Sequence, residues 1–184
     1  MESQDSKGKI VKETFPSEIV SIIGDILAGI VLIILILPFK SFIILILIIP
    51  ALLSLRGNIS GPFIARTSND LIIGDLNKRS WIENVSATLT LSIITALLIG
   101  MFGIVIDIFL IRVSLIPLEI LILIPLISIL LTLSISIPIS TILNYMAFKY
   151  GLNPNNVVNP IMTAVGDFSM VVFFYITLIL LGVP

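Results

Sequence analysis

One carboxylate lies inside an otherwise apolar segment near the C-terminus. Asp167 belongs to the run from Pro160 to Val183, which contains no Lys or Arg. An aspartate at the centre of a membrane helix costs about 2.5–3.5 kcal/mol on insertion scales, so such a residue usually marks an ion or proton path. Two alternatives to an ion path stay open: Asp167 is protonated, or it pairs with Arg56 of another apolar segment. We take Asp167 as the main candidate for a cation ligand.

Oxygen-bearing side chains accompany this aspartate. Pro160, Thr163 and Asp167 share one helical face, at positions i, i+3 and i+7. Asn159 followed by Pro160 predicts a helix start, with an N-cap amide and then proline at the first helical position. Asp167 would then lie roughly 10–12 Å along the helix from its cytosolic end, at about 1.5 Å per residue. Asn159 and Thr163 are therefore candidates beside Asp167.

A second polar pattern lies in "PALLSLRGNISGPFIARTSND", which begins at Pro50. Small or amide residues recur on one helical face: Ser54, Gly57, Asn58, Gly61, Ala65 and Ser68. Close helix packing explains the glycines, but it does not require the amide of Asn58. Pro62 loosens the helix and frees a backbone carbonyl, which is tolerated in a membrane where the helix lines a cavity. The face is therefore either a packing surface or one wall of an ion path.

The remaining polar groups in apolar segments are weaker candidates. Hydroxyls recur every four residues at Ser128, Thr132, Ser136 and Ser140. Such hydroxyls often bond the carbonyl four residues earlier, so we favour a structural role for them. Asp25 is in the inner half of the first apolar segment. Asp107 and Glu119 are near external segment ends, where a carboxylate reaches water.

The composition sets the class of protein and the chemistry open to it. The chain is 58% hydrophobic and 11% charged, whereas soluble domains have about 45–50% apolar and about 25% charged residues. It has no Cys and no His, which excludes disulfides, thiol and imidazole chemistry and the usual Zn or haem ligands. A bound metal must be held by oxygen, as Mg²⁺ and Ca²⁺ are. We expect no enzyme activity, no cofactor and, with a net charge of −1, no nucleic-acid partner.

The apolar segments predict an all-α membrane protein with five transmembrane helices, because a spanning helix needs about 20 apolar residues. The expected spans are residues 17–37, 41–69, 85–111, 115–148 and 160–183. Residues 1–16 are expected as a short cytosolic segment, without a cleavable signal peptide, and residues 17–184 as the membrane domain. Between the second and third spans, residues 70–83 are expected as a charged loop whose Trp81 suits the membrane interface.

The basic residues predict the orientation of these spans. Two of them, Lys40 and Arg112, fall in turns on one side. Seven fall in segments on the other side: Lys7, Lys9, Lys12, Arg66, Lys78, Arg79 and Lys149. By the positive-inside rule, the N-terminus is cytosolic and the C-terminus external. We expect a multi-pass protein of the cytoplasmic (plasma) membrane.

Two motifs together resemble a known family. "IIPALLSLRGNISGPFIAR", followed later by "GLNPNNVVNPIMTAVGDF", resembles the membrane domain of the MgtE family of magnesium transporters and channels, especially its eukaryotic solute-carrier relatives. The resemblance extends over about residues 17–184. It implies a homodimeric or pseudo-dimeric Mg²⁺ pore. The family's fifth-helix aspartate falls on Asp167, the asparagine eight residues before it on Asn159, and a Gly-Asn pair on Gly57 and Asn58.

The chain also departs from that family. Bacterial members carry a cytosolic Mg²⁺-sensing region with CBS domains, which residues 1–16 cannot hold. A second asparagine of the second helix is replaced by Gly61, and the aspartate that begins the last motif by Asn153. Eukaryotic relatives join two such units in one chain, whereas this chain has one unit.

These observations lead to a functional hypothesis. One carboxylate holds Mg²⁺ poorly, so we expect a dimer that brings two Asp167 side chains together with oxygens of Gly57, Asn58, Asn159 and Thr163. Mg²⁺ dehydrates reluctantly, which favours a wide site that binds it through water. A Na⁺- or H⁺-coupled secondary transporter and a non-transporting membrane assembly subunit are the alternatives. A heterodimer with a related chain also stays open.

Overall fold

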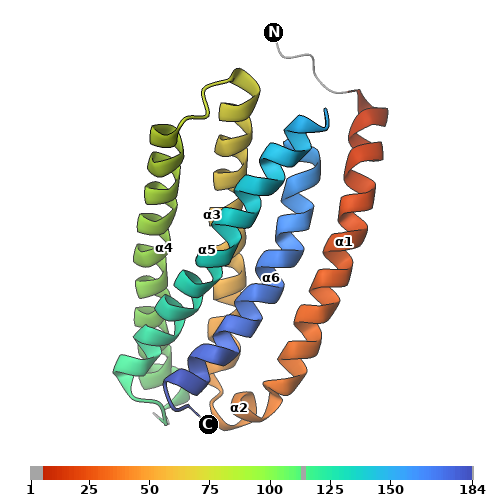
Figure 1. Cartoon of the computed structure of the whole chain (residues 1–184). Helices are drawn as coiled ribbons and strands as arrows, with labels where there is room; N and C mark the ends of the chain where they lie inside the picture. Colours follow the sequence, from red (N-terminus) through yellow and green to blue (C-terminus); the bar gives the residue numbers. More distant parts are fainter. Residues whose placement is uncertain (1–5, 113–114, 184) are drawn as a thin grey trace.

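The computed structural model describes residues 6–112 and 115–183, and within these ranges it contains helices and no strand. Five helices are long and apolar enough to cross a membrane (Figure 1), which confirms the all-α class and the number of spans. They are α1 (Lys7–Ile34), α3 (Ile44–Ile73), α4 (Lys78–Ile106), α5 (Leu118–Lys149) and α6 (Pro154–Leu180). A short helix, α2 (Ile36–Ser41), precedes α3, and a π-helical turn, η1 (Asp107–Ile111), extends α4.

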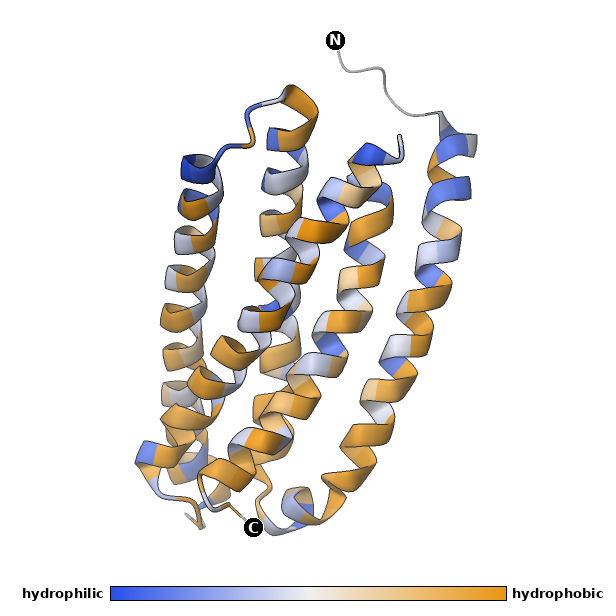
Figure 2. Cartoon of the chain, in the orientation of Figure 1, coloured by the Kyte–Doolittle hydropathy of each residue, from blue (hydrophilic) through white to orange (hydrophobic). Residues whose placement is uncertain are grey.

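The helices run up and down between two ends of the bundle. The start of α1, the α3–α4 turn and the α5–α6 turn lie at one end, which we call the N-terminal end (Figure 1). Helix α2, the α4–α5 connection and the end of α6 lie at the other, the C-terminal end. Hydrophobic residues cover most of each helix, and hydrophilic residues are densest at the N-terminal end (Figure 2).

Helix α6 begins six residues earlier than the sequence predicts. Asn153 is its N-cap, with a side chain that accepts from the Asn155 backbone N–H at 3.0 Å, and Pro154 opens the helix. The expected start at Asn159 and Pro160 is wrong, because Pro160 lies inside the helix. Proline leaves the carbonyl four residues earlier without its helical donor. Here that carbonyl, of Asn156, lies 3.4 Å from Ser17 Oγ of α1, whose shorter hydrogen bond is to the Thr14 carbonyl at 2.7 Å.

Helix α1 also begins earlier, at Lys7 rather than near residue 17. Its N-cap Ser6 accepts from the Lys9 backbone N–H at 3.3 Å. One turn later, the Glu13 carboxylate accepts from Asn156 Nδ2 at 2.9 Å and from the Asn153 backbone N–H at 3.3 Å. The added turns of α1 therefore hold the start of α6.

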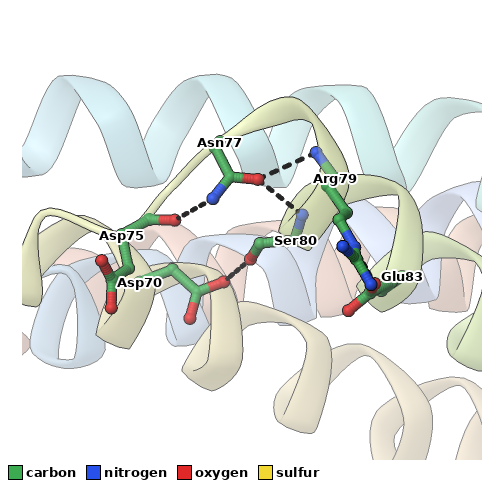
Figure 3. Close-up of polar contacts among 6 residues, drawn as sticks. All are labelled: Asp70, Asp75, Asn77, Arg79, Ser80 and Glu83. Carbon is green, nitrogen blue, oxygen red and sulfur yellow. Dashed lines mark hydrogen bonds and ion pairs between the residues drawn. The ribbon is translucent and has the colours of Figure 1, made fainter.

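The expected loop at residues 70–83 is mostly helical. Only residues 74–77 separate α3 from α4, and Gly74 ends α3 with a φ of 80° that favours glycine. Asn77 then caps α4: its Oδ1 accepts from the backbone N–H groups of Arg79 and Ser80, each at 2.9 Å, and its Nδ2 donates to the Asp75 carbonyl at 3.0 Å (Figure 3). A single asparagine thus fixes this turn.

Helices α3, α5 and α6 supply most of the core, and α1 packs mainly against α6. The largest fully buried side chains include Phe63, Ile64, Ile129, Leu133, Met162 and Phe174. Trp81 lies in the first turns of α4, where its indole N–H donates to Thr141 Oγ1 of α5 at 3.0 Å. Because α6 touches α1, α3 and α5, polar groups on α6 meet those of several helices.

Candidate cation site

Asp167 lies midway along α6, about 20 Å from Pro154 at about 1.5 Å per residue. Its side chain is 22% exposed, and its Oδ1 accepts from Arg56 Nη2 of α3 at 2.5 Å. The side chain of Arg56 is only 5% exposed. Of the two alternatives to an ion path, protonation and pairing, the structure therefore shows the pairing with Arg56. The pair forms because either charge alone would be costly to bury at this depth.

Gly166 makes room for this ion pair. A Cβ atom at position 166 would lie 2.6 Å from Cδ and 2.8 Å from Nη1 of Arg56, so a larger residue would displace the arginine. Arg56 Nη1 also donates to the Met162 carbonyl at 3.3 Å, one turn nearer the N-terminal end. Its Nε is buried and has no partner. The guanidinium is therefore held along α6, with part of its hydrogen-bonding capacity unused.

A second carboxylate, Asp25 of α1, is near enough to Asp167 for the two carboxyl groups to interact electrostatically. Gly24 allows this approach, since a Cβ there would lie 2.8 Å from the Ala164 Cα atom. Sequence reasoning ranks Asp25 as a weak candidate. The Gly-Asp pair occurs three times, at residues 24–25, 74–75 and 166–167. In the two pairs that lie inside helices, the glycine admits a neighbouring helix and the aspartate follows it.

Asn159, Thr163 and Asp167 follow one another at four-residue spacing on α6, and we call them the α6 row. Asn159 is exposed, Thr163 is half-buried, and the next turns bring Met170 and Phe174, which are 1% and 0% exposed. Thr163 Oγ1 donates to the Asn159 carbonyl at 3.1 Å, which leaves its lone pairs available. The row thus runs from the N-terminal end to Asp167, and the apolar core follows on the side of the C-terminal end.

The small-residue face of α3 is mostly exposed, and we call its five outward members the α3 stripe: Ser54, Gly57, Asn58, Gly61 and Ala65. Ser68 departs from the expected face, because it is fully buried. A Cβ at Gly61 would lie 4.0 Å from Asn159 Oδ1, so the stripe adjoins the α6 row. Among the described residues, Gly57 and Asn58 make no hydrogen bond to Asp167.

The stripe borders a groove of about 330 Å³ between α3 and α4. Ser54 and Asn58 line it from α3, and Thr95 lines it from α4. Asn58 Nδ2 donates to Ser54 Oγ at 3.4 Å, and the Asn58 side chain is otherwise exposed. An amide at this depth, whose oxygen has no partner among the described residues, suits contact with water or with a second chain.

The hydroxyls of α5 divide into two kinds. Thr132 donates to the Ser128 carbonyl at 2.8 Å and Ser140 to the Ile137 carbonyl at 3.0 Å, as expected for a structural role. Ser128 and Ser136 have buried hydroxyls without a partner. Ser136 faces a cavity of about 10 Å³, with Ser60, Thr88 and Ser140 also in its wall. A cavity of this volume is about large enough to hold one water molecule.

The acids near the C-terminal end are placed differently from one another. Glu119 is exposed in the first turn of α5, as expected. Asp107 is only 2% exposed and its Oδ2 has no hydrogen-bond partner in the part of the chain that the structure describes, so the expectation that it reaches water is wrong. It begins the π-helical turn and lines a cavity together with Ser41 and Ile116.

Comparison with known families matches these elements. A family model described as MgtE, divalent cation transporter, matches residues 49–177, which include Arg56, the α3 stripe and the α6 row but not Asp25. The comparisons with curated proteins and with solved structures give no significant match. Five of the chain's helices are long and apolar enough to cross a membrane, and the family model covers most of the chain. This multi-pass membrane protein therefore belongs to the MgtE family of divalent cation transporters.

Proposed function

We propose that the chain transports Mg²⁺ across the cytoplasmic membrane as one half of a dimeric pore. The α6 row and the α3 stripe line the path, and Asp167 of each protomer supplies its charge. The observation that carries this proposal is a polar surface on two neighbouring helices: Asn58 and Asn159 are exposed on the single chain, and Gly57, beside Asn58, has open space around it.

A second copy of the chain accounts for that surface better than lipid does. Unsatisfied amide groups in hydrocarbon cost several kcal/mol each, so exposed asparagines need water or protein beside them. Gly57 has no atom within 4 Å of a would-be Cβ, which means that its surface is free to receive another helix. Two-fold symmetry would place two stripes and two rows face to face around one axis.

The available ligands suit a hydrated divalent cation. The row and the stripe offer amide, hydroxyl and carboxylate oxygens, which hard cations prefer. Mg²⁺ keeps several of its waters in most protein sites, so Asp167 acts mainly through its charge and through water-mediated bonds. Binding must also be weak enough to release the ion on the other side. Thr163, Asn159, Asn58 and Gly57 complete this wide site.

One observation favours coupled transport as a second candidate. The α6 row ends at Asp167, and Met170 and Phe174 close the core on the side of the C-terminal end. A path open toward one end and closed toward the other fits alternating access, in which Asp167 also binds Na⁺ or H⁺. Counterflow measured with the membrane potential held at zero separates the two candidates, because a passive pore then does not accumulate labelled ion in exchange for unlabelled ion.

The test is Mg²⁺ flux into proteoliposomes that contain the purified chain alone, with Asp167→Asn as the paired variant. The proposal expects flux with the wild-type chain and loss of most of it in the variant. Folded wild-type protein that neither binds nor moves Mg²⁺ would contradict it and leave an assembly subunit as the better interpretation. Flux that appears only after a related chain is added would identify a heterodimer.

A further inference from the structure

The ion pair at Asp167 does not balance the charge around it. Asp25 is next to Gly24, where α1 comes closest to α6, and its carboxylate interacts electrostatically with that of Asp167. Arg56 is the one cation paired with Asp167 among the described residues. With both acids ionised, the three groups carry one net negative charge. Asp25 is exposed on α1 at membrane depth, where an unpaired carboxylate is costly. With both acids ionised, the arrangement is therefore short of one positive charge.

We propose that Asp25 is a second carboxylate of the cation site, and that Arg56 is a tethered cation that leaves Asp167 when the divalent ion binds. This inference rests on the proposed function and adds to it a residue outside the matched family region, together with a means of control. A divalent ion between Asp25 and Asp167 neutralises both carboxylates. If Arg56 stayed on Asp167, the same site would carry an excess positive charge and the two cations would repel each other.

The geometry gives Arg56 a second anchor. Its Nη1 already donates to the Met162 carbonyl at 3.3 Å, one turn from Asp167 toward the N-terminal end, and its Nε has no partner in the present arrangement. The guanidinium can therefore shift along α6 without losing all of its hydrogen bonds. Arg56 then holds the empty site closed and yields Asp167 to an ion that arrives along the α6 row.

Gly24, the residue before Asp25, determines how closely α1 approaches α6 near Asp167. Gly24 lets α1 approach the backbone of α6 at Ala164, one turn before Asp167, and a Cβ there would push the two helices apart. Gly29 lies on the same helix with open space around it. Gly24 and Gly29 provide a test in which no charge changes. Gly24→Ala is expected to move Asp25 away from Asp167, whereas Gly29→Ala leaves Asp25 in place.

The first experiment measures Mg²⁺ binding to the purified full chain in nanodiscs by titration calorimetry. Asp25→Asn and Gly24→Ala are each expected to weaken binding about ten- to hundredfold, the usual loss when a group supporting a metal ligand is removed. Glu119→Gln and Gly29→Ala are the matched controls and are expected to bind like wild type. Normal binding by Asp25→Asn, with binding lost in Asp167→Asn, would overturn the inference and leave the proposed function standing. No Mg²⁺ binding by the wild type would contradict both.

The second experiment follows Arg56 itself. Arg56→Gln is expected to bind Mg²⁺ more tightly, by about tenfold, because a competing charge is removed; weaker binding by a folded variant would overturn the role of tethered cation. Because Arg56→Gln also leaves Asp167 without its partner, a measurement on the wild-type protein is needed to follow Arg56 directly. In protein labelled with ¹⁵N-arginine, the Nε–H resonance of Arg56, assigned with Arg56→Lys, is expected to shift as Mg²⁺ is added. The absence of a shift at saturating Mg²⁺ would equally overturn the role.

Discussion

Gly166 and Arg56 are in such close contact that a Cβ on the glycine would lie 2.6 Å from Cδ of the arginine. We therefore predict that Gly166→Ala destabilises the protein by about 1–3 kcal/mol, the usual cost of overpacking a filled core. Thermal unfolding in detergent measures this effect. Gly29→Ala is the control, because its Cβ meets no atom within 4 Å. Equal unfolding temperatures for the two variants would show that Arg56 moves aside without cost.

Asp167→Asn keeps the shape of the side chain and removes its charge. We predict a folded, membrane-inserted protein that has lost most of its divalent cation flux. The variant should also be less stable than wild type, because a buried arginine without its carboxylate carries an uncompensated charge, a change that costs about 3–5 kcal/mol at fully buried pairs. Flux into proteoliposomes and thermal unfolding are the two measurements. Wild-type flux from this variant would remove Asp167 from the transport path.

The bias of basic residues predicts which end of the bundle faces the cytosol. The chain has no cysteine, so single cysteines can be placed at either end without background labelling. Asn77→Cys, in the α3–α4 turn, is expected to resist a membrane-impermeant maleimide in intact cells and to react after lysis. Lys40→Cys, at the opposite end, is expected to react in intact cells. The reverse pattern would invert the predicted orientation.

The number of spans is predictable from sequence, because a run of about 20 apolar residues is a property of one segment. The residues at which helices begin and end are less predictable. At the start of α6 two Asn-Pro pairs give the same local signal, and a bond to another helix favours the earlier one: the Glu13 carboxylate of α1 accepts from the Asn156 side chain at 2.9 Å. No pattern within α6 reveals that bond, so the predicted start is six residues late and Asp167 is deeper than expected.

In the candidate site too, features of a single helix are predictable from sequence, whereas contacts between helices are not. Asp167 is identifiable because an acid in an apolar helix is conspicuous, and Thr163 and Asn159 follow from helical spacing. The sequence offers Arg56 only as one possible partner and does not connect Asp25 to Asp167, because helical periodicity does not say which helix packs on which. Arg56 is 111 positions away in sequence and is brought in by the contact of α3 with α6 at Gly166. Asp25 depends likewise on the approach of α1 at Gly24.

The α3 stripe predicts where two protomers meet. Asn58 is exposed at membrane depth and adjoins glycines that leave room for a second helix, so Asn58→Cys is expected to crosslink between protomers under mild oxidation. Met101→Cys on α4 is an equally membrane-embedded control at a position that is 56% exposed and apolar, where contact with lipid is expected. Crosslinked dimer on denaturing gels measures both. Dimer from Met101→Cys without dimer from Asn58→Cys would place the interface on α4 and separate the stripe from the pore axis.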